Sequence, residues 1–522
     1  MGAYYTPPLA AVTMARWLLA NGARSVLEPS MGDGAFLNAV ESAAQIGGVD
    51  VDIWGSELAS DTFQEVVSAG LVRAEQAFCG DFLALEPFPV DGVIGNPPYV
   101  RLRHLPPIEG RRALDAANDV LGFPMDPGAS IWMPFVLHAT RFLRAGGCLA
   151  FVLPYEFTYV RYARPLWNFL RNHFRDIRIA RVHERVFPEI MQDVVLFFAA
   201  GFGGATSDVR FEAFERVSDL VDARPAVATR ISVSRVIGGE RPFVESLLPG
   251  DLLQLLEGAL GERLTPARNL VRFNIGYVSG DKTFFHPESS TVQEFSLPSD
   301  HLMPALTSSR QLRGLGIRTS AIPDPRSFLY LPNKVPLSAD ERRYIEFGER
   351  SGVSQRFKCR IRDPWFVTPG VRVPDLVLPV FADAPLMVMN DASWVVSNSL
   401  LCGYVKEGVS AASVIARWYT SLTLLQAEIE VHALGGGVRV FVPNEAGAIR
   451  LPMEAVETLP LMKHLHDSIR SGRTAQAFEH GDAAVLVGQM GLRNEYVELI
   501  REGVEILAHW RNSAKTSRRS AA

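Results

Sequence analysis

The residues best suited to chemistry are Asn96-Pro97-Pro98-Tyr99, which directly follow an apolar run from Asp91 to Gly95. The apolar run predicts a short buried strand, and the prolines end it. The Asn96 side-chain oxygen and the Pro97 carbonyl oxygen can both accept hydrogen bonds from one NH2 group, and Tyr99 can stack on the ring that carries it. These residue types suit a clamp for a planar nitrogen. A plain strand end with a turn is the simpler alternative.

Such a clamp would change the reactivity of the amine that it holds. An exocyclic amine is a poor nucleophile because its lone pair is delocalised into the ring. Two acceptors that hold its protons would pull the nitrogen towards a tetrahedral geometry and free the lone pair. Because open α/β sheets bind ligands at the carboxyl ends of their strands, the position of the motif fits this use.

A second candidate site is the glycine loop around Gly32 and Gly34, with an apolar strand before it and an apolar helix after it. The two glycines let backbone approach a ligand closely. Leu37 stands where a dinucleotide fingerprint has its third glycine, and Glu28 and Asp33 would repel a pyrophosphate. The same carboxylates suit an ammonium and a sulfonium. The loop therefore favours S-adenosylmethionine over NAD, with an ordinary strand-turn-helix as the alternative.

Two more predicted strands end in polar residues. The strand from Val51 to Gly55 is followed by Glu57, at the position where the ribose hydroxyls of a nucleoside are usually held. The strand from Gln76 to Gly80 is followed by Asp81, which could accept from an adenine amine, and Phe82, which could cover the ring. Each is an ordinary strand end when taken alone. Their succession predicts one polar rim shared with Asn96.

The elements that must position this rim alternate between strands and helices from Val26 to about Ala200. This alternation predicts an α/β fold with a doubly wound, mostly parallel, seven-stranded Rossmann-like sheet. The last two strands lie close together in the sequence, which predicts an antiparallel finish. The Arg- and Pro-rich segment from Val100 to Gly128 predicts a loop near the site that can touch phosphates, or else a solvated surface loop.

The alternation of predicted strands and helices ends after the first 200 residues. Residues 201–244 predict a linker or a small hairpin, so we expect a first domain at 1–235 and an α+β domain with a helical C-terminal part at 236–522. Arg310 to Arg318 and Arg356 to Arg362 are basic clusters interleaved with aromatic residues. This composition is typical of nucleic-acid binding and also of an ordinary solvated domain.

Bulk properties set wider limits. The 522 residues exceed what one core holds, and a formal net charge of −5 neither requires nor excludes nucleic acid. The four cysteines are scattered without a CxxC pair, so neither disulfides nor a metal site is expected. With no apolar run of membrane-spanning length and no signal-peptide pattern, we expect a cytoplasmic protein.

Taken in order, these stretches resemble the gamma-class N6-adenine DNA methyltransferases, the modification enzymes of restriction-modification systems. The resemblance covers the first 200 residues well and the second half loosely. The order of the motifs marks the gamma arrangement, because the upstream segment precedes the cofactor loop and the Asn-Pro-Pro-Tyr turn precedes a long C-terminal half. The segments that carry the resemblance are Tyr5-Thr6-Pro7, Leu27-Glu28-Pro29 with Gly32 and Gly34, Glu57, Asp81-Phe82, Asn96-Pro97-Pro98-Tyr99, Val186-Phe187-Pro188, Gly276-Tyr277-Val278-Ser279-Gly280 and Gly435-Gly436-Gly437.

The resemblance implies a role for each matched residue. It implies catalytic roles for Asn96, Pro97 and Tyr99, and it implies that Phe187, otherwise expected in the core, stacks on a target base together with Tyr99. Residues implied to bind S-adenosylmethionine are Thr6, Glu28, Gly32, Gly34, Glu57, Asp81 and Phe82.

The implied reaction is methyl transfer to the N6 amine of an adenine rotated out of duplex DNA, with the second domain as the target-recognition domain. Methyltransferases that act on guanine N2 of ribosomal RNA or on a protein glutamine are rival readings, and so is a DNA-recognition subunit without catalysis. Pro374-Asp375 lacks the acid-x-Lys continuation of a nuclease, so cleavage is not expected in this chain. A cognate restriction endonuclease or a defence-complex subunit stays open as a partner.

Overall fold

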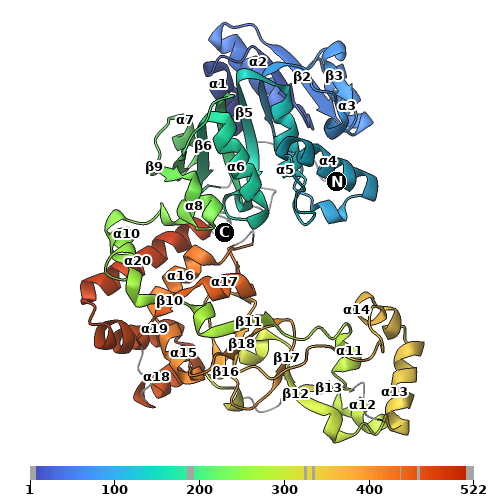
Figure 1. Ribbon diagram of the computed structural model, residues 1–522, viewed down its shortest axis with the longest axis vertical. Coiled ribbons are helices and arrows are strands. Elements are labelled where there is room, and N and C mark those ends of the chain that lie inside the picture. The colour runs from blue at the N-terminus through green and yellow to red at the C-terminus, as the bar shows by residue number, and fades with distance from the viewer. Residues whose placement is uncertain are drawn as a thin grey trace, which may run out of the picture. The chain divides into compact units, whose positions relative to one another are not determined.

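The computed structural model of the chain describes residues 8–184, 193–321, 326–331, 336–434, 437–454 and 459–512. The chain forms two compact units: among the described residues, the first runs to Leu247 and also includes Asn512, and the second runs from Leu248 to Arg511 (Figure 1). The boundary expected from sequence lay at residues 235/236.

The first unit is built around a nine-stranded mixed sheet in the order β3-β2-β1-β4-β5-β7-β6-β8-β9. Its strands are β1 (Ser25–Glu28), β2 (Asp52–Glu57), β3 (Ala77–Cys79), β4 (Val90–Gly95), β5 (Leu143–Pro154), β6 (Phe174–Val182), β7 (Val194–Phe202), β8 (Asp208–Phe214) and β9 (Val227–Ser232). Strands β1 to β7 match the seven predicted ones.

The expectation of seven strands is corrected by β8 and β9, which extend the sheet beyond β6. The segment that suggested a linker forms them because residues along β8 alternate between buried and partly exposed positions, which is the pattern of a strand. The antiparallel finish is present, since β7 runs antiparallel to both β5 and β6.

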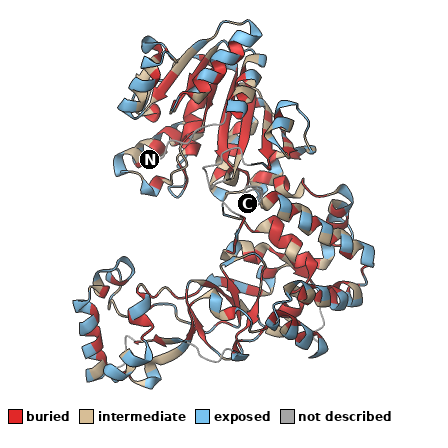
Figure 2. Ribbon diagram, turned by 180° about the vertical axis from the view of Figure 1, so that it is seen from behind, coloured by how far each residue is buried: buried red, intermediate tan, exposed pale blue. Residues whose placement is uncertain are grey.

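The buried residues of the first unit concentrate along the central strands of the sheet (Figure 2). Helices cover these strands and supply most of the remaining core. They are α1 (Pro8–Ala20), α2 (Ala35–Gly47), α3 (Ser60–Ser68), α4 (Pro107–Leu121), α5 (Trp132–Ala139), α6 (Arg164–His173), α7 (Val217–Val221), α8 (Val233–Gly238) and α9 (Pro242–Glu245).

Strand β1 lies between β2 and β4 and runs parallel to both. The chain therefore winds outwards in both directions from β1 and β4, which makes this pair the topological switch point of the sheet. Ligands of open α/β sheets bind in the crevice at this point, outside the carboxyl ends of the strands. The glycine loop follows β1 and the Asn-Pro-Pro-Tyr turn follows β4, so both predicted motifs meet there.

The predicted loop between Val100 and Gly128 contains a helix, α4, which corrects that expectation. Pro107 occupies the first turn of α4, where its missing N–H costs nothing, and Gly122 ends the helix in the left-handed conformation. Between these signals the small residues Ala113 and Ala117 are fully buried. The helical spacing of such small residues is easily overlooked among arginines and prolines.

The second unit contains short, mostly antiparallel sheets, ordered β11-β18-β14-β16, β13-β12-β17, β10-β20 and β15-β19. The strands are β10 (Leu264–Pro266), β11 (Val271–Ile275), β12 (Leu302–Leu306), β13 (Arg326–Leu329), β14 (Leu376–Pro379), β15 (Phe381–Ala382), β16 (Val388–Met389), β17 (Val395–Val396), β18 (Leu400–Val405), β19 (Arg439–Val440) and β20 (Arg450–Pro452).

The longer helices of this unit gather towards its C-terminal end, as an α+β domain with a helical C-terminal part predicts. The helices are α10 (Gly250–Glu257), α11 (Lys282–Phe285), α12 (Ser289–Glu294), α13 (Ala339–Arg350), α14 (Phe357–Arg360), α15 (Ala411–Trp418), α16 (Ser421–Glu430), α17 (Pro443–Ala448), α18 (Leu459–Arg470), α19 (Thr474–Gly481) and α20 (Asn494–Arg511).

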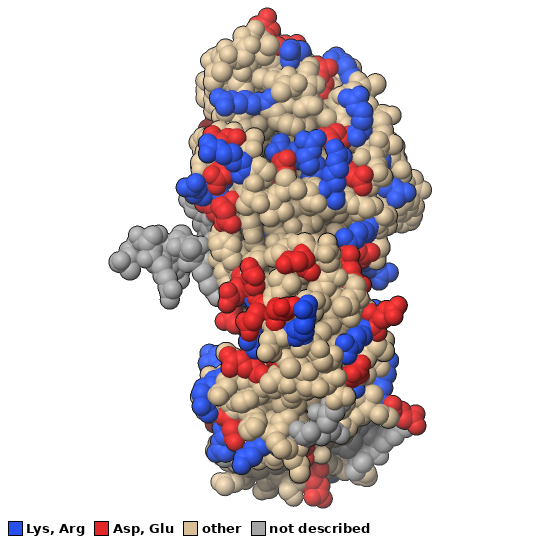
Figure 3. Space-filling view, turned by 90° about the vertical axis from the view of Figure 1, so that its left-hand side faces the viewer, with Lys and Arg blue, Asp and Glu red and all other residues tan. Residues whose placement is uncertain are grey.

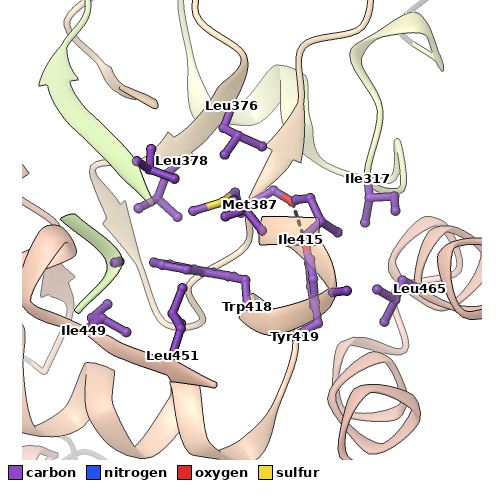
Figure 4. Close-up of a cluster of buried hydrophobic side chains, with 14 of the residues drawn as sticks. Ile317, Leu376, Leu378, Met387, Ile415, Trp418, Tyr419, Ile449, Leu451 and Leu465 are labelled. Carbon is purple, nitrogen blue, oxygen red and sulfur yellow. Dashed lines mark hydrogen bonds between the residues drawn. The ribbon is translucent and has the colours of Figure 1, made fainter. Parts of the chain in front are cut away.

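A large core of the second unit packs helices α15 to α19 onto the β11-β18-β14-β16 sheet (Figure 4). Trp418 and Tyr419 are fully buried at its centre. The Tyr419 hydroxyl donates to the Met387 carbonyl oxygen at 2.9 Å, so the buried polar group is satisfied. Within the described residues, no helix is both long enough and apolar enough to cross a membrane.

Candidate active site

The two predicted motifs are joined directly at the switch point. The Ser30 hydroxyl, which follows β1, donates to the backbone carbonyl oxygen of Asn96 at 3.2 Å. Gly95, the last residue of β4, packs so closely on the turn after β1 that an added Cβ would lie 3.2 Å from Pro29 Cδ. The glycine loop and the Asn-Pro-Pro-Tyr turn therefore form one continuous surface.

The side chain of Asn96 is held by the aromatic residue three positions later. The Tyr99 hydroxyl donates to Asn96 Oδ1 at 2.7 Å, and the carbonyl oxygen of Val152 on β5 lies 3.0 Å away as a second acceptor. Both side chains are half-buried. The amide oxygen keeps a second lone pair, so it can still accept a hydrogen bond from an amine of a ligand. Sequence reasoning gave Tyr99 a stacking role and missed this hydroxyl contact.

The glycine loop is fastened to the end of β2 by Glu57. One carboxylate oxygen accepts from the Gly32 backbone N–H at 3.0 Å and the other from the Ala59 N–H at 2.9 Å. A Cβ built on Gly32 would meet no atom within 4 Å, so space is open at the tip of the loop. Glu57 thus shapes the loop, and its remaining lone pairs are available to hydroxyl groups.

Glu28, the last residue of β1, is buried without a full set of partners. Its side chain is 2 % exposed, and among the described residues Oε2 has no hydrogen-bond partner. Burial and the nearby Asp33 carboxylate raise the pKa of Glu28 well above its ordinary value; the Leu37 backbone N–H lowers this pKa and the Glu57 carboxylate raises it further. An orphaned buried carboxylate oxygen fits a cationic or hydrogen-bond-donating ligand.

Asp81 has two protein partners in the structure. One oxygen accepts from the Leu83 N–H at 3.0 Å and the other pairs with Arg112 of α4 at 2.7 Å. Beside this pair lies an open hollow of about 530 Å3, lined by Arg111, Arg112 and Arg141 among other residues. Contact between Asp81 and an adenine amine would have to share the carboxylate with Arg112. This pairing could not be predicted from the sequence, because the two residues are far apart in the chain.

Phe82 lies in the core of the first unit. Its side chain is 2 % exposed and packs against the rings of Phe135, His138 and Phe142. A ring enclosed on these sides offers almost no face to a ligand, so its position does not support the expected cover over an adenine. The sequence could not reveal this burial, because the three packing partners come from a segment more than fifty residues later.

Two predicted site residues, Thr6 and Phe187, lie outside the described residues, as does the glycine pair at 435–436. Arg101 belongs to the arginine-rich segment after Tyr99, which was expected to touch phosphates. Arg101 pairs with Glu156 at 2.9 Å and lies over the ring of Tyr162. Its guanidinium thus braces the backbone that follows the turn.

Comparison with known proteins gives two family matches. The model described as "Eco57I restriction-modification methylase" matches residues 65–187, and the model described as "Type II methyltransferase M.Eco57I, C-terminal domain" matches residues 240–486. Type II methyltransferase M.AccI of Acinetobacter calcoaceticus is 22 % identical over 465 residues, which are 85 % of this chain and 83 % of that protein. M.PaeR7I of Pseudomonas aeruginosa is 28 % identical over 428 residues, 70 % of this chain and 68 % of the relative.

Two solved structures share the fold over most of the chain. The Type IIL restriction-modification enzyme MmeI, solved in complex with DNA, aligns with a TM-score of 0.53 at 12 % identity and covers 95 % of this chain and 75 % of that one. A nuclease-deletion mutant of the Type ISP enzyme LlaGI, solved with a DNA substrate mimic, aligns with a TM-score of 0.52 at 10 % identity and covers 90 % of this chain and 46 % of that one.

The fold and the switch-point site define the class: the first unit is an α/β methyltransferase-like domain. The family matches are more specific, and they confirm the resemblance found in the sequence. Together with the relatives, they support a methyltransferase of the restriction-modification type.

Proposed function

We propose that the chain transfers a methyl group from S-adenosylmethionine to the N6 amine of an adenine in duplex DNA, as the modification enzyme of a restriction-modification system. The single observation that carries this proposal is the Asn96-Tyr99 turn at the switch point, joined through Ser30 to the glycine loop. M.AccI and M.PaeR7I are named Type II methyltransferases, which supports the assignment.

The proposed work of the turn is to prepare an amine nitrogen. Asn96 Oδ1 and the Pro97 carbonyl oxygen accept its two protons, which draws the lone pair out of conjugation. The Tyr99 hydroxyl restrains the orientation of the amide, because it donates a hydrogen bond to Oδ1. Preorganised acceptors of this kind provide the rate by positioning and electrostatics, without a covalent intermediate.

The residues around the glycine loop fit S-adenosylmethionine. Glu28 presents a buried, unpartnered oxygen that suits an ammonium, Gly32 leaves space at the loop, and Glu57 has lone pairs for ribose hydroxyls. When bound, the cofactor supplies a methyl group on a positively charged sulfur. We assign Thr6 and Phe187 to cofactor binding and base stacking from the sequence resemblance alone.

The test is methyl transfer with purified chain, labelled S-adenosylmethionine and unmethylated duplex DNA, followed by sequencing that maps modified bases. We expect N6-methyladenine within one sequence context. Label found only in ribosomal RNA or protein, or on a base other than adenine, would contradict the proposal. A chain that binds the duplex without transferring label would favour a recognition subunit.

A further inference from the structure

The second unit carries an exposed turn whose chemistry the proposed reaction does not use. Helix α14 and the residue after it expose Phe357 and Ile361, which are 60 % and 61 % accessible, beside the exposed cations Lys358 and Arg360. We name these four residues the α14 tip. Figure 1 shows α14 at one end of the lobe that contains α11, α12 and α13.

The tip is anchored by three residues at a spacing of three: Cys359 lies within it, and Arg356 and Arg362 flank it. Arg356 pairs with the buried carboxylate of Asp281, and Cys359 is fully buried. Arg362 donates to the carbonyl oxygens of Val278 and Ser279 at 2.5 Å and 2.9 Å. Cys359 is buried and Arg362 is half-buried, whereas the four tip residues are exposed, so the tip residues are the ones that point outwards.

The anchoring leaves little freedom of movement. A Cβ built on Gly280 would lie 2.8 Å from Cys359 Sγ and 3.3 Å from Lys358 Cβ, so the turn is seated directly on the backbone of the Gly276–Asp281 segment. Asp281 also caps α11 by accepting from the Phe284 N–H at 2.7 Å. The tip is therefore a rigid projection, and a rigid surface loses less entropy when it binds.

The charges of the tip are available to a partner. Among the described residues, neither Lys358 nor Arg360 forms an ion pair, and the acid nearest in sequence is the exposed Asp363. Both cations lie against the Phe357 ring, at 5.4 Å and 5.6 Å from its centroid. This arrangement places two positive charges around an exposed aromatic face.

On the face drawn in Figure 3, Lys and Arg side chains are interspersed with Asp and Glu side chains. The chain has a net charge of −5, so attraction to a polyanion must come from local groups. We infer that the α14 tip docks on duplex DNA, with Lys358 and Arg360 on phosphates and Phe357 and Ile361 against sugars and base edges. Charge complementarity to a polyanion selects this partner, and apolar side chains that enter a groove are a known means of DNA contact.

This inference rests on the proposed function, since it names the surface that meets the proposed DNA substrate. The test measures binding of a fluorescein-labelled mixed-sequence duplex to the full chain between 50 and 200 mM salt. Lys358→Ala with Arg360→Ala should make the negative slope of log affinity against log salt less steep by about 2, because each lost phosphate contact contributes about 0.9. Phe357→Ala should weaken binding roughly fivefold or more and leave the slope unchanged.

Two controls separate the tip from general effects. Lys463→Ala with Arg470→Ala removes an exposed Lys and Arg from α18, and Phe381→Ala removes an exposed ring of β15. Both should keep the wild-type slope and affinity, and S-adenosylmethionine binding should be the same in every variant. Tip variants that bind DNA like the wild type would overturn the inference alone. A wild-type chain that neither binds nor methylates duplex DNA would overturn the proposed function as well.

Discussion

In the proposed reaction the environment of Asn96 matters most, because its amide oxygen would have to be both oriented and available. The hydroxyl of Tyr99 occupies one lone pair of this oxygen and lies near the Val152 carbonyl oxygen of the neighbouring strand. The sequence could predict that Asn96 and Tyr99 act together from their spacing. It could not predict the Val152 contact, because that depends on β5 lying beside β4.

Tyr99→Phe tests the orienting hydroxyl without removing the ring. The variant should keep cofactor and DNA affinity but lose about two- to tenfold in turnover, the value of a hydrogen bond worth about 0.5–1.5 kcal/mol. Single-turnover methyl transfer measures this loss, and Tyr404→Phe in the second unit provides a matched removal of a hydroxyl. Unchanged turnover in Tyr99→Phe would show that the hydroxyl has no orienting role.

Glu28 should make the stability of the ligand-free chain depend on pH. Its pKa is raised in the folded state, so the folded chain binds more protons than the unfolded chain between the ordinary carboxyl pKa and the raised value. Stability should therefore fall as pH rises through this window, since ionisation leaves an unpaired buried charge. Thermal unfolding across pH should show this fall in the wild type and its absence in Glu28→Gln.

The same group gives a second, independent readout. Only the ionised carboxylate attracts an ammonium, so affinity for S-adenosylmethionine should rise with pH through the raised pKa of Glu28 and become insensitive to pH in Glu28→Gln. If both chains show the same pH dependence of affinity, Glu28 does not contact the cofactor.

At the scale of elements, hydrophobic periodicity in the sequence predicted the apolar strands. Elements and contacts that depend on tertiary packing could not be predicted in this way. All seven predicted strands exist because each is a short apolar run bounded by turn residues. Strand β9 was missed because it has only one buried residue, Ile231, and α4 because its buried face is built from alanine and glycine. The pairing of Arg112 with Asp81 and the burial of Phe82 arise only once these elements pack together.

The seating of the glycine loop on β2 can be tested at this scale. A Cβ on Gly55 would lie 2.1 Å from Met31 Sδ and 2.8 Å from its Cγ, so Gly55→Ala must displace the buried side chain of Met31, which belongs to the glycine loop. We expect about tenfold weaker cofactor binding, with overpacking of about 1–3 kcal/mol lowering the unfolding temperature by roughly 2–12 °C. Calorimetry measures both effects. In Gly47→Ala the added Cβ meets only Val49, at 3.8 Å, so this variant should lower neither the cofactor affinity nor the unfolding temperature.

At the scale of the whole molecule, the chain consists of two units, each with its own core. The two family models follow this division, since one covers part of the first unit and the other lies almost wholly in the second. The loss of the strand-helix rhythm predicted that a second domain exists. Its internal pairing could not be predicted, because strands of two to six residues carry almost no periodic signal.

Ligand binding should act on one unit alone. We expect two calorimetric transitions, and S-adenosylmethionine at a hundred times its Kd should raise only one, by about 5–11 °C, because about 2.7 kcal/mol is added to a unit of this size. Gly55→Ala should lower that same transition. A rise in both transitions, or in the one that Gly55→Ala leaves unchanged, would contradict placement of the cofactor site in the first unit.

We propose above all that the turn after β4 accepts hydrogen bonds from an amino group and so makes its nitrogen nucleophilic enough to be methylated. Single-turnover transfer of labelled methyl to adenine in duplex DNA by Asn96→Ala tests it most directly. We expect a loss of about a hundredfold or more in rate, with S-adenosylmethionine binding unchanged. Transfer by Asn96→Ala at the wild-type rate would contradict it.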